Sequence, residues 1–306
     1  MDLRGCGTAL VTPFQSDGTI DTNALTALTE RQIENGIDFL VACGTTAETP
    51  TLSESEWLAV IRLVAAVAGA RVPVIAGCTH NATSTAIERA EQASKVRGVA
   101  ALLTANPYYN KPSQEGQFQH FRAIAQRVTM PVVLYNIPSR AGCNLEPATV
   151  GRLLAECPNI RGVKESSGNL QQITELVHMV PDDFSVLAGD DNVALAAIAV
   201  GAKGLVSVAS NEIPAEMVEM IHAALGDDWR RARTLHRKYY PLLVANFWET
   251  SPAPVKHVLG RMGLLEPNLR LPLVPTSGST AKRLDALMEE LGLRADVTKP
   301  AGTKPA

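Results

Sequence analysis

VAALLTANPYYNKPSQEGQFQHFRAIAQRVTMPVVLYN, residues 99–136, contains the pattern that decides the fold. This stretch begins and ends with short apolar runs of strand character, and a segment with helical spacing lies between them. Strands that alternate with helices predict parallel strands joined by crossover helices, because a parallel neighbour can be reached only by crossing over the sheet.

The same alternation fills the first two-thirds of the chain. Eight such runs are present: CGTALVTPF (6–14), FLVACG (39–44), VPVIAG (72–77), VAALLTA (99–105), PVVLYN (131–136), IRGVKES (160–166), FSVLAGD (184–190) and KGLVSVA (203–209). Ser53 with Glu56 forms a capping box that predicts a helix start, and Asn169 predicts another. Eight units predict a (β/α)8 TIM barrel rather than a doubly wound open sheet.

After residue 209 the strand signal stops. Helices are predicted over 212–225, 227–248, 252–262 and 279–292, with Pro241 kinking or dividing the second. We therefore predict three parts: a (β/α)8 catalytic barrel over 1–210, a C-terminal helical extension over 211–294, and a frayed tail over 295–306.

Composition excludes several functional classes. The 306 residues are 46% apolar and 19% charged with a net charge of -3, which argues against disorder. Lys+Arg 28 against Asp+Glu 31 leaves no basic excess, so no nucleic-acid partner is expected. Five scattered cysteines fit a reducing cytoplasm, and no run is long enough for a membrane span or export signal. We therefore expect a cytoplasmic protein.

Polar residues cluster where the predicted strands end, which is where barrel enzymes build their active sites. The segments concerned are Gly44–Glu48, Asn106–Asn110, Tyr135–Arg140, Lys164–Ser166 and Gly189–Asp191. Asp190 and Asp191 are interpreted as caps of the next helix. The histidines show no ligand spacing, so no metal site is predicted.

Lys164 is the most informative of these residues. Side chains alternate along a strand, so Ile160, Gly162 and Lys164 are expected to share one face. If that face is the barrel interior, burial disfavours the charged form of a lysine and frees its amine to attack a carbonyl. The alternative is an outward lysine paired with a carboxylate, but lysines are seldom buried without a use.

Other rim residues each have a functional and an ordinary interpretation. Tyr135 can move protons beside an imine-forming lysine, or it can be a core aromatic. Thr45 and Thr46 can hold a small carboxylate, or they can cap a turn. Arg140 can clamp a second carboxylate, or it can be a solvated loop arginine.

Four motifs together carry a family resemblance. Gly44-Thr45-Thr46-Ala47-Glu48, Pro107-Tyr108-Tyr109-Asn110-Lys111-Pro112-Ser113, Tyr135-Asn136-Ile137-Pro138-Ser139-Arg140 and Gly162-Val163-Lys164-Glu165 occur in this order. With them the chain resembles the dihydrodipicolinate synthases, also called 4-hydroxy-tetrahydrodipicolinate synthases, of the pyruvate-dependent class I aldolase superfamily. The resemblance runs from about residue 4 to about residue 292.

The resemblance implies a lyase that condenses pyruvate with L-aspartate 4-semialdehyde in lysine and diaminopimelate biosynthesis. It implies that Lys164 forms an imine with pyruvate and that Tyr135 donates protons in a relay with Thr45 and a neighbouring subunit's copy of Tyr109. Pyruvate would be bound by Thr46 and the carbonyl of Val206, and the semialdehyde carboxylate by Arg140. It further implies a homotetramer built as a dimer of dimers, with no metal or organic cofactor.

Other activities of the superfamily stay open. N-acetylneuraminate lyases and 2-keto-3-deoxy-sugar-acid aldolases share the lysine and tyrosine, but a polyol substrate does not need the carboxylate clamp of Arg140. A catalytically silent barrel that only binds a keto acid is the other alternative. Such a protein would have no reason to keep Lys164, Tyr135, Thr45 and Tyr109 together. Three residues depart from the family pattern: Ala47 for glycine, Asn106 for threonine and Ser251 for asparagine.

Lysine feedback is expected to be weak or absent. The resemblance implies an interface pocket of two histidines, a glutamate, an asparagine and a tyrosine, of which Asn81 and Tyr108 are present. Glu54 and Trp57 stand at the histidine positions and Thr85 at the glutamate position. An ammonium group that loses its carboxylate partner is costly to desolvate. Trp57 is expected to add bulk to the pocket, whereas Glu54 would restore part of the charge pairing.

Overall fold

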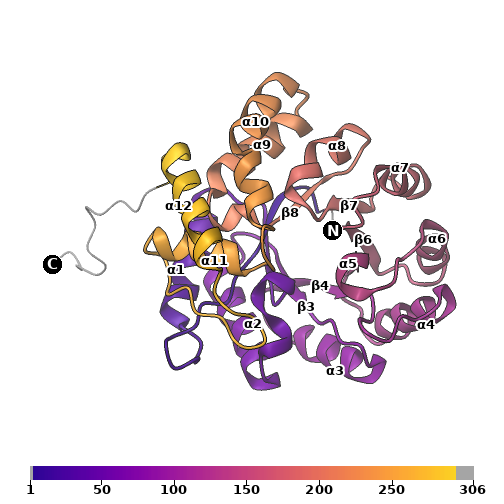
Figure 1. The fold of residues 1–306 in the computed structure, drawn as a ribbon. Coiled ribbons are helices and arrows are strands. Elements are labelled where there is room, and N and C mark those ends of the chain that lie inside the picture. The colour runs from indigo at the N-terminus through magenta and orange to yellow at the C-terminus, as the bar shows by residue number, and fades with distance from the viewer. Residues whose placement is uncertain (1–2, 294–306) are drawn as a thin grey trace.

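A ring of eight parallel strands forms the centre of the computed structural model, which describes residues 3–293 (Figure 1). The strands are β1 (Gly5–Ala9), β2 (Phe39–Ala42), β3 (Val74–Gly77), β4 (Val99–Ala105), β5 (Val132–Asn136), β6 (Ile160–Glu165), β7 (Ser185–Ala188) and β8 (Gly204–Ser207). β1 pairs with β8, with Gly7 opposite Val206, so the ring is closed. The TIM-barrel prediction is confirmed and the open sheet is excluded.

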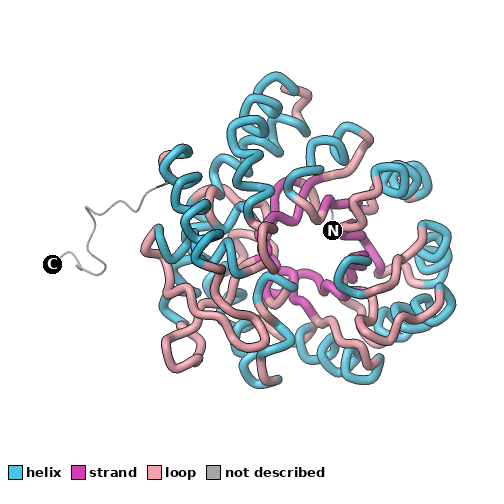
Figure 2. The backbone as a smooth tube through the Cα atoms, viewed as in Figure 1, coloured by secondary structure: helices cyan, strands magenta, loops and turns pink. Residues whose placement is uncertain are grey.

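Helices surround the ring of strands (Figure 2). They are α1 (Thr22–Glu34), α2 (Glu54–Ala68), α3 (Thr83–Ala93), α4 (Gln114–Ala125), α5 (Pro138–Ala141), α6 (Pro147–Glu156), α7 (Leu170–Met179), α8 (Ala194–Ala199), α9 (Pro214–Leu225), α10 (Trp229–Ala245), α11 (Ala253–Arg261) and α12 (Gly278–Leu291). Four single turns lie at strand ends: η1 (Thr45–Ala47), η2 (Thr49–Thr51), η3 (Asp191–Val193) and η4 (Ala209–Asn211).

Two apolar cores follow from side-chain alternation along the strands. Phe39 and Val41 of β2 belong to the cluster inside the barrel, whereas Leu40 packs in the larger cluster between the strands and the helices. Gly7 leaves space for the Phe39 ring, since a β-carbon at that position would lie 1.9 Å from it. The strands are therefore buried on both faces, as parallel sheets are.

The predicted helix starts are confirmed. Ser53 Oγ accepts from the Glu56 N–H (3.3 Å), and the Glu56 carboxylate accepts from the Ser53 N–H (2.9 Å). Asn169 Oδ1 accepts from two backbone N–H groups of α7. Pro241 does not divide its helix, because α10 is one helix with Pro241 inside it; a kink at Pro241 stays a prediction.

The first strand is shorter than predicted. β1 ends at Ala9 rather than near Phe14, because Pro13 has no N–H for a strand ladder and the chain turns back at Gln15–Thr19. The Gln15 N–H donates to the Thr19 carbonyl (2.8 Å), which closes this turn.

The helices after β8 lie on one side of the molecule (Figure 1). α9 packs against β1, β8 and α10, and α12 packs against α10 and α11. The division into a barrel over 1–210 and an extension over 211–294 stays a prediction, and the predicted tail over 295–306 lies outside the described residues. Between residues 3 and 293, no helix is long and apolar enough to cross a membrane.

His120 is a buried titratable group on α4. It is 3% exposed, its Nδ1 lies 2.9 Å from the Thr83 hydroxyl, and its Nε2 has no hydrogen-bond partner in the described part of the chain. Burial, with a smaller contribution from His80, lowers the pKa of His120 to about 4. The folded protein therefore holds this imidazole neutral where an unfolded chain would protonate it.

We predict that His120 makes the fold acid-sensitive. The unfolded chain binds a proton near pH 6.5 and the folded chain only near pH 4, so stability falls as pH drops through this interval. His120→Gln should flatten the pH dependence of the free energy of unfolding by up to about 1.4 kcal/mol per pH unit. Urea denaturation between pH 7 and pH 4.5 measures this slope, and parallel curves for the two proteins would contradict the prediction.

Candidate active site

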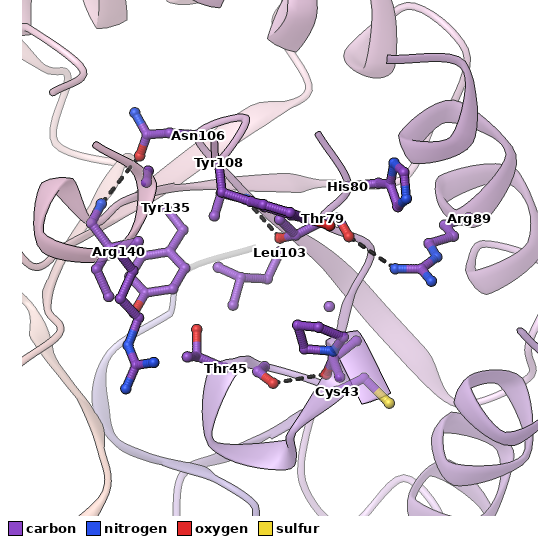
Figure 3. A pocket seen from close by; sticks show the side chains of 17 residues that line it. Cys43, Thr45, Thr79, His80, Arg89, Leu103, Asn106, Tyr108, Tyr135 and Arg140 are labelled. Atoms are coloured by element: carbon purple, nitrogen blue, oxygen red, sulfur yellow. Dashed lines mark hydrogen bonds between the residues drawn. The ribbon is translucent and has the colours of Figure 1, made fainter. Parts of the chain in front are cut away.

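A cavity of about 290 Å³ opens where several strands end on the rim of the barrel. Thr45, Tyr135 and Arg140 line it, and they come from the segments after β2, in β5 and after β5. In Figure 3, Tyr135 and Arg140 lie on one side of the cavity with Thr45 near them, and His80 and Arg89 lie on the other side. The rim position is where the fold favours a site.

Lys164 lies in the barrel interior next to Tyr135. The two residues are opposite one another in the β5–β6 register, and Lys164 Nζ is 4.2 Å from the centre of the Tyr135 ring. Lys164 is 5% exposed and Tyr135 is 4% exposed. Gly189, directly after the neighbouring strand β7, leaves space for the lysine, because a β-carbon there would lie 2.9 Å from Lys164 Cε. A primary amine and a phenol thus share one buried position.

Ile160 does not share the face of Lys164, and this expectation is wrong. Ile160 packs with Val163 in the cluster between strands and helices. The β5–β6 register shifts between Val132 and Val133, so one residue of β6 is passed over between Ile160 and Gly162. Such a bulge resets the alternation, and a single sequence gives no sign of it.

Glu165 follows Lys164 on β6 and points to the opposite face of the strand, where it is buried away from the cavity. Its carboxylate accepts from Asn136 Nδ2 (3.0 Å), from Gln172 Nε2 (2.9 Å) and from the Ser167 N–H (2.7 Å). Neutral amide donors therefore satisfy it, and it does not pair with Lys164. The alternative in which Lys164 faces outward is excluded.

Thr45 and Thr46 form the η1 turn. Thr45 is half-buried in the cavity wall, and Thr46 is 5% exposed. Ala47, where the family pattern has glycine, does not take a positive φ; the left-handed residue is Glu48, with φ 55°. The alanine therefore strains nothing at this turn.

Arg140 is exposed on the short helix α5, at the mouth of the cavity. Its Nη2 donates to the Ser251 carbonyl (3.0 Å), which holds the guanidinium near the rim. Asn106 fixes the start of the same segment, because its Oδ1 accepts from the Ile137 N–H (3.1 Å) while its Nδ2 donates to Gln117 (2.6 Å). Asn106, which stands where the family pattern has threonine, thus has a structural role.

Four expected site residues, Lys164, Thr46, Tyr109 and Val206, are not among the residues that line the cavity, although Lys164 lies against Tyr135, which does line it. Tyr109 projects from the surface with 87% of its area exposed and a φ of 73°. Val206 is buried inside the barrel on β8, in the same interior cluster as Tyr135. The structure therefore brings Lys164, Tyr135, Thr45 and Arg140 to one region and leaves Tyr109 free to contact something else.

Two further rim residues, Ser166 and Asp190, lie beside Lys164, although neither was predicted to belong to the site. Ser166 is 7% exposed, and its hydroxyl has no partner within residues 3–293. A β-carbon at Gly189 would lie 1.8 Å from this hydroxyl, which places it next to the lysine. Burial raises the pKa of Asp190, while Lys164 lowers it. Side chains two positions apart on a strand share a face, so the spacing of Lys164 and Ser166 could have identified the serine from the sequence.

Neither aspartate caps the next helix through its side chain, so that interpretation is wrong. Within the described residues, Asp190 stands at the N-cap position of η3 without a side-chain cap bond, and α8 has no such bond either. The carboxylate of Asp191 accepts from the Ser207 hydroxyl (2.5 Å) and from the N–H groups of Val208 (3.0 Å) and Ala209 (3.2 Å). It therefore holds the η4 turn after β8, a contact between distant segments that local helix-start rules do not cover. Among residues 3–293, no three His, Cys, Asp or Glu side chains form a metal-binding group.

Comparison with known proteins agrees with this geometry. The family model described as "Dihydrodipicolinate synthetase family" matches residues 2–291. The chain belongs to this family. A 4-hydroxy-tetrahydrodipicolinate synthase of Acidobacterium capsulatum is 61% identical over 300 residues, with 98% of this chain and 99% of the relative covered.

Solved structures of the dihydrodipicolinate synthetase family have the same fold. Dihydrodipicolinate synthase from Aquifex aeolicus is 41% identical with a TM-score of 0.94, covering 96% of this chain and 100% of its own. The chloride-inhibited enzyme from Acinetobacter baumannii, complexed with pyruvate, is 40% identical with a TM-score of 0.92, covering 95% and 99%.

The lysine pocket implied by the family resemblance is altered in an unexpected way. Trp57 does not fill it, because Trp57 is fully buried in the core and donates Nε1 to the Gly77 carbonyl (2.8 Å). The Glu54 carboxylate is bound by Arg89 and so is not free to pair with an ammonium. Arg89 also lines the cavity, 5.5 Å from the Trp57 ring centre, and its charge is balanced by that of Glu54.

We predict that L-lysine inhibits this protein weakly or not at all. Arg89 already occupies the Glu54 carboxylate and Thr85 supplies none, so neither position offers a free carboxylate to an ammonium ligand. Steady-state assays with lysine raised into the millimolar range check this. Clear partial inhibition below that range would contradict it.

Proposed function

We propose that this protein condenses pyruvate with L-aspartate 4-semialdehyde to give 4-hydroxy-tetrahydrodipicolinate, a step of lysine and diaminopimelate biosynthesis. The observation that carries the proposal is the buried amine of Lys164 beside the phenol of Tyr135, at the ends of strands whose rim also carries Arg140. The names of the relatives support the same reaction.

The proposed first half-reaction is imine formation. Lys164 Nζ attacks the keto carbon of pyruvate, and the carbinolamine loses water, with Tyr135 passing protons to and from its oxygen. Thr45 is proposed to join this relay, while Thr46 and the carbonyl of Val206 hold the pyruvate. Loss of a methyl proton then gives the enamine. The chemistry needs no metal or organic cofactor.

The second half-reaction joins the two substrates. The enamine carbon attacks the aldehyde carbon of the semialdehyde, whose carboxylate is proposed to bind the guanidinium of Arg140. The amino group of the semialdehyde then attacks the imine carbon and closes the ring, which releases Lys164. Arg140 favours this substrate over the polyols of N-acetylneuraminate lyases and sugar-acid aldolases, since a short acid needs a cation at the rim.

Assembly and location belong to the same proposal. Tyr109 is proposed to enter the site of a neighbouring subunit, and its 87% exposed side chain supports this. We propose a homotetramer made of two tight dimers, working in the cytoplasm.

Lys164→Ala is predicted to lower turnover by about 10³-fold or more while the fold stays intact, because the nucleophile is removed from inside a preformed barrel. A coupled assay with pyruvate and aspartate semialdehyde, together with circular dichroism, measures both. Lys203→Ala, at the opposite end of the strands, is the matched control and should keep full activity. Activity lost in the control but kept in Lys164→Ala would contradict the assignment of Lys164 as the imine-forming residue. Cleavage of sialic acid without condensation would contradict the proposed substrate.

Arg140→Ala is predicted to raise the KM for aspartate semialdehyde. A charge-assisted contact contributes about 1.5–3 kcal/mol, so kcat/KM should fall by about 10- to 150-fold. The KM for pyruvate should change little, because pyruvate is held elsewhere. Unchanged kinetics with the semialdehyde would show that Arg140 is only a solvated loop residue.

A further inference from the structure

A buried ion pair joins the rim of the barrel to the C-terminal helices. Lys256 on α11 and Glu48 after the η1 turn both have fully buried side chains, and Lys256 Nζ lies 2.5 Å from Glu48 Oε1. The same Nζ donates to the Asn268 carbonyl (2.8 Å) and lies 4.2 Å from the centre of the Phe14 ring. Burial lowers the pKa of Lys256 to about 8, although Glu48 raises it.

Glu48 is held from a second side as well. Its Oε2 accepts from the Arg270 N–H (3.1 Å), in the segment between α11 and α12. Both carboxylate oxygens are thus engaged by residues that are more than 200 positions away in the sequence. A charge buried in this way is stable only with its partners in place.

The backbone of Glu48 is part of the turn that carries the two threonines. The Glu48 N–H donates to the Thr45 carbonyl (3.1 Å), and the Glu48 carbonyl accepts from the Thr51 N–H (2.9 Å). Glu48 has a left-handed backbone, φ 55° and ψ 32°, which a side-chain-bearing residue keeps only when its surroundings impose it. The ion pair supplies such a constraint one residue after the η1 turn.

The segment just before α11 also contacts Arg140 at the mouth of the cavity. Ser251, two residues before α11, accepts the hydrogen bond from Arg140 through its carbonyl. The segment Ser251–Lys256 therefore contacts both the threonine turn, through Glu48, and the arginine at the rim. α11 itself packs against η4 and α12.

We propose that Lys256 and Glu48 are positioning residues, whose ion pair ties α11 to the η1 turn and so holds Thr45 and Thr46 where the keto acid binds. The inference rests on the proposed function for the identity of the keto acid, pyruvate. The positioning itself is a property of the turn and can be tested without substrate.

Hydrogen–deuterium exchange tests the tether directly. In Lys256→Met, which keeps the apolar stem and removes the ammonium, amide exchange over residues 44–52 should become about ten-fold faster or more, because the constraint on Glu48 is lost. Asp285→Asn is the matched control: it removes the negative charge that pairs with His257 and Arg261 between α11 and α12. It should speed exchange in α12 and leave residues 44–52 unchanged. Equal exchange over 44–52 in wild type and Lys256→Met would overturn the proposal.

Kinetics separate positioning from a merely structural role. Lys256→Met should raise the KM for pyruvate by about ten-fold or more and that for aspartate semialdehyde by less than about three-fold. The double variant Glu48→Gln/Lys256→Met removes the unpaired buried charge, so its Tm should return toward wild type while the pyruvate KM stays high. Asp285→Asn should keep the wild-type KM.

One kinetic outcome counts against the inference, and another counts against the proposed function alone. A pyruvate KM that returns together with the Tm in the double variant would show that the pair only stabilises the fold. A wild-type protein that does not turn over pyruvate would overturn the proposed function and the naming of the keto acid, whereas the exchange experiment would still decide whether the tether holds the turn.

Discussion

The pairing of β5 with β6 is the constraint on which the site depends. It sets Tyr135 opposite Lys164, with the amine 4.2 Å from the ring centre inside the barrel. A slip of one residue would turn Lys164 toward the helices and bring Glu165 inside, since strand side chains alternate. The amide donors around Glu165 oppose that slip, because they match a carboxylate on the outer face.

Closure of the ring then collects the remaining groups. Because β1 pairs with β8, all eight strand ends lie on one rim, and turns far apart in sequence become neighbours. Thr45 and Arg140 come from segments after β2 and β5 and line one cavity. The helices after β8 contribute no group to the list of proposed reacting residues, but they contact this rim through Ser251 and Lys256.

Much of this could be predicted from local patterns. Alternation of strands and helices predicts the barrel, and period-two alternation puts Lys164 and Tyr135 inside it, because both signals are carried by neighbouring residues. The errors share another cause. The bulge that turns Ile160 outward, the long-range bonds of Asp191 and the burial of Trp57 all depend on residues distant in the sequence. The Lys256–Glu48 pair is hidden from sequence for the same reason.

The most direct test of the account is chemical trapping of the buried amine. Treating the protein with pyruvate and borohydride should reduce the imine to a stable secondary amine, which peptide mass spectrometry locates. The account predicts one adduct, on Lys164, that appears only when pyruvate is present. An adduct on another lysine such as Lys203, or no adduct at saturating pyruvate, would contradict it.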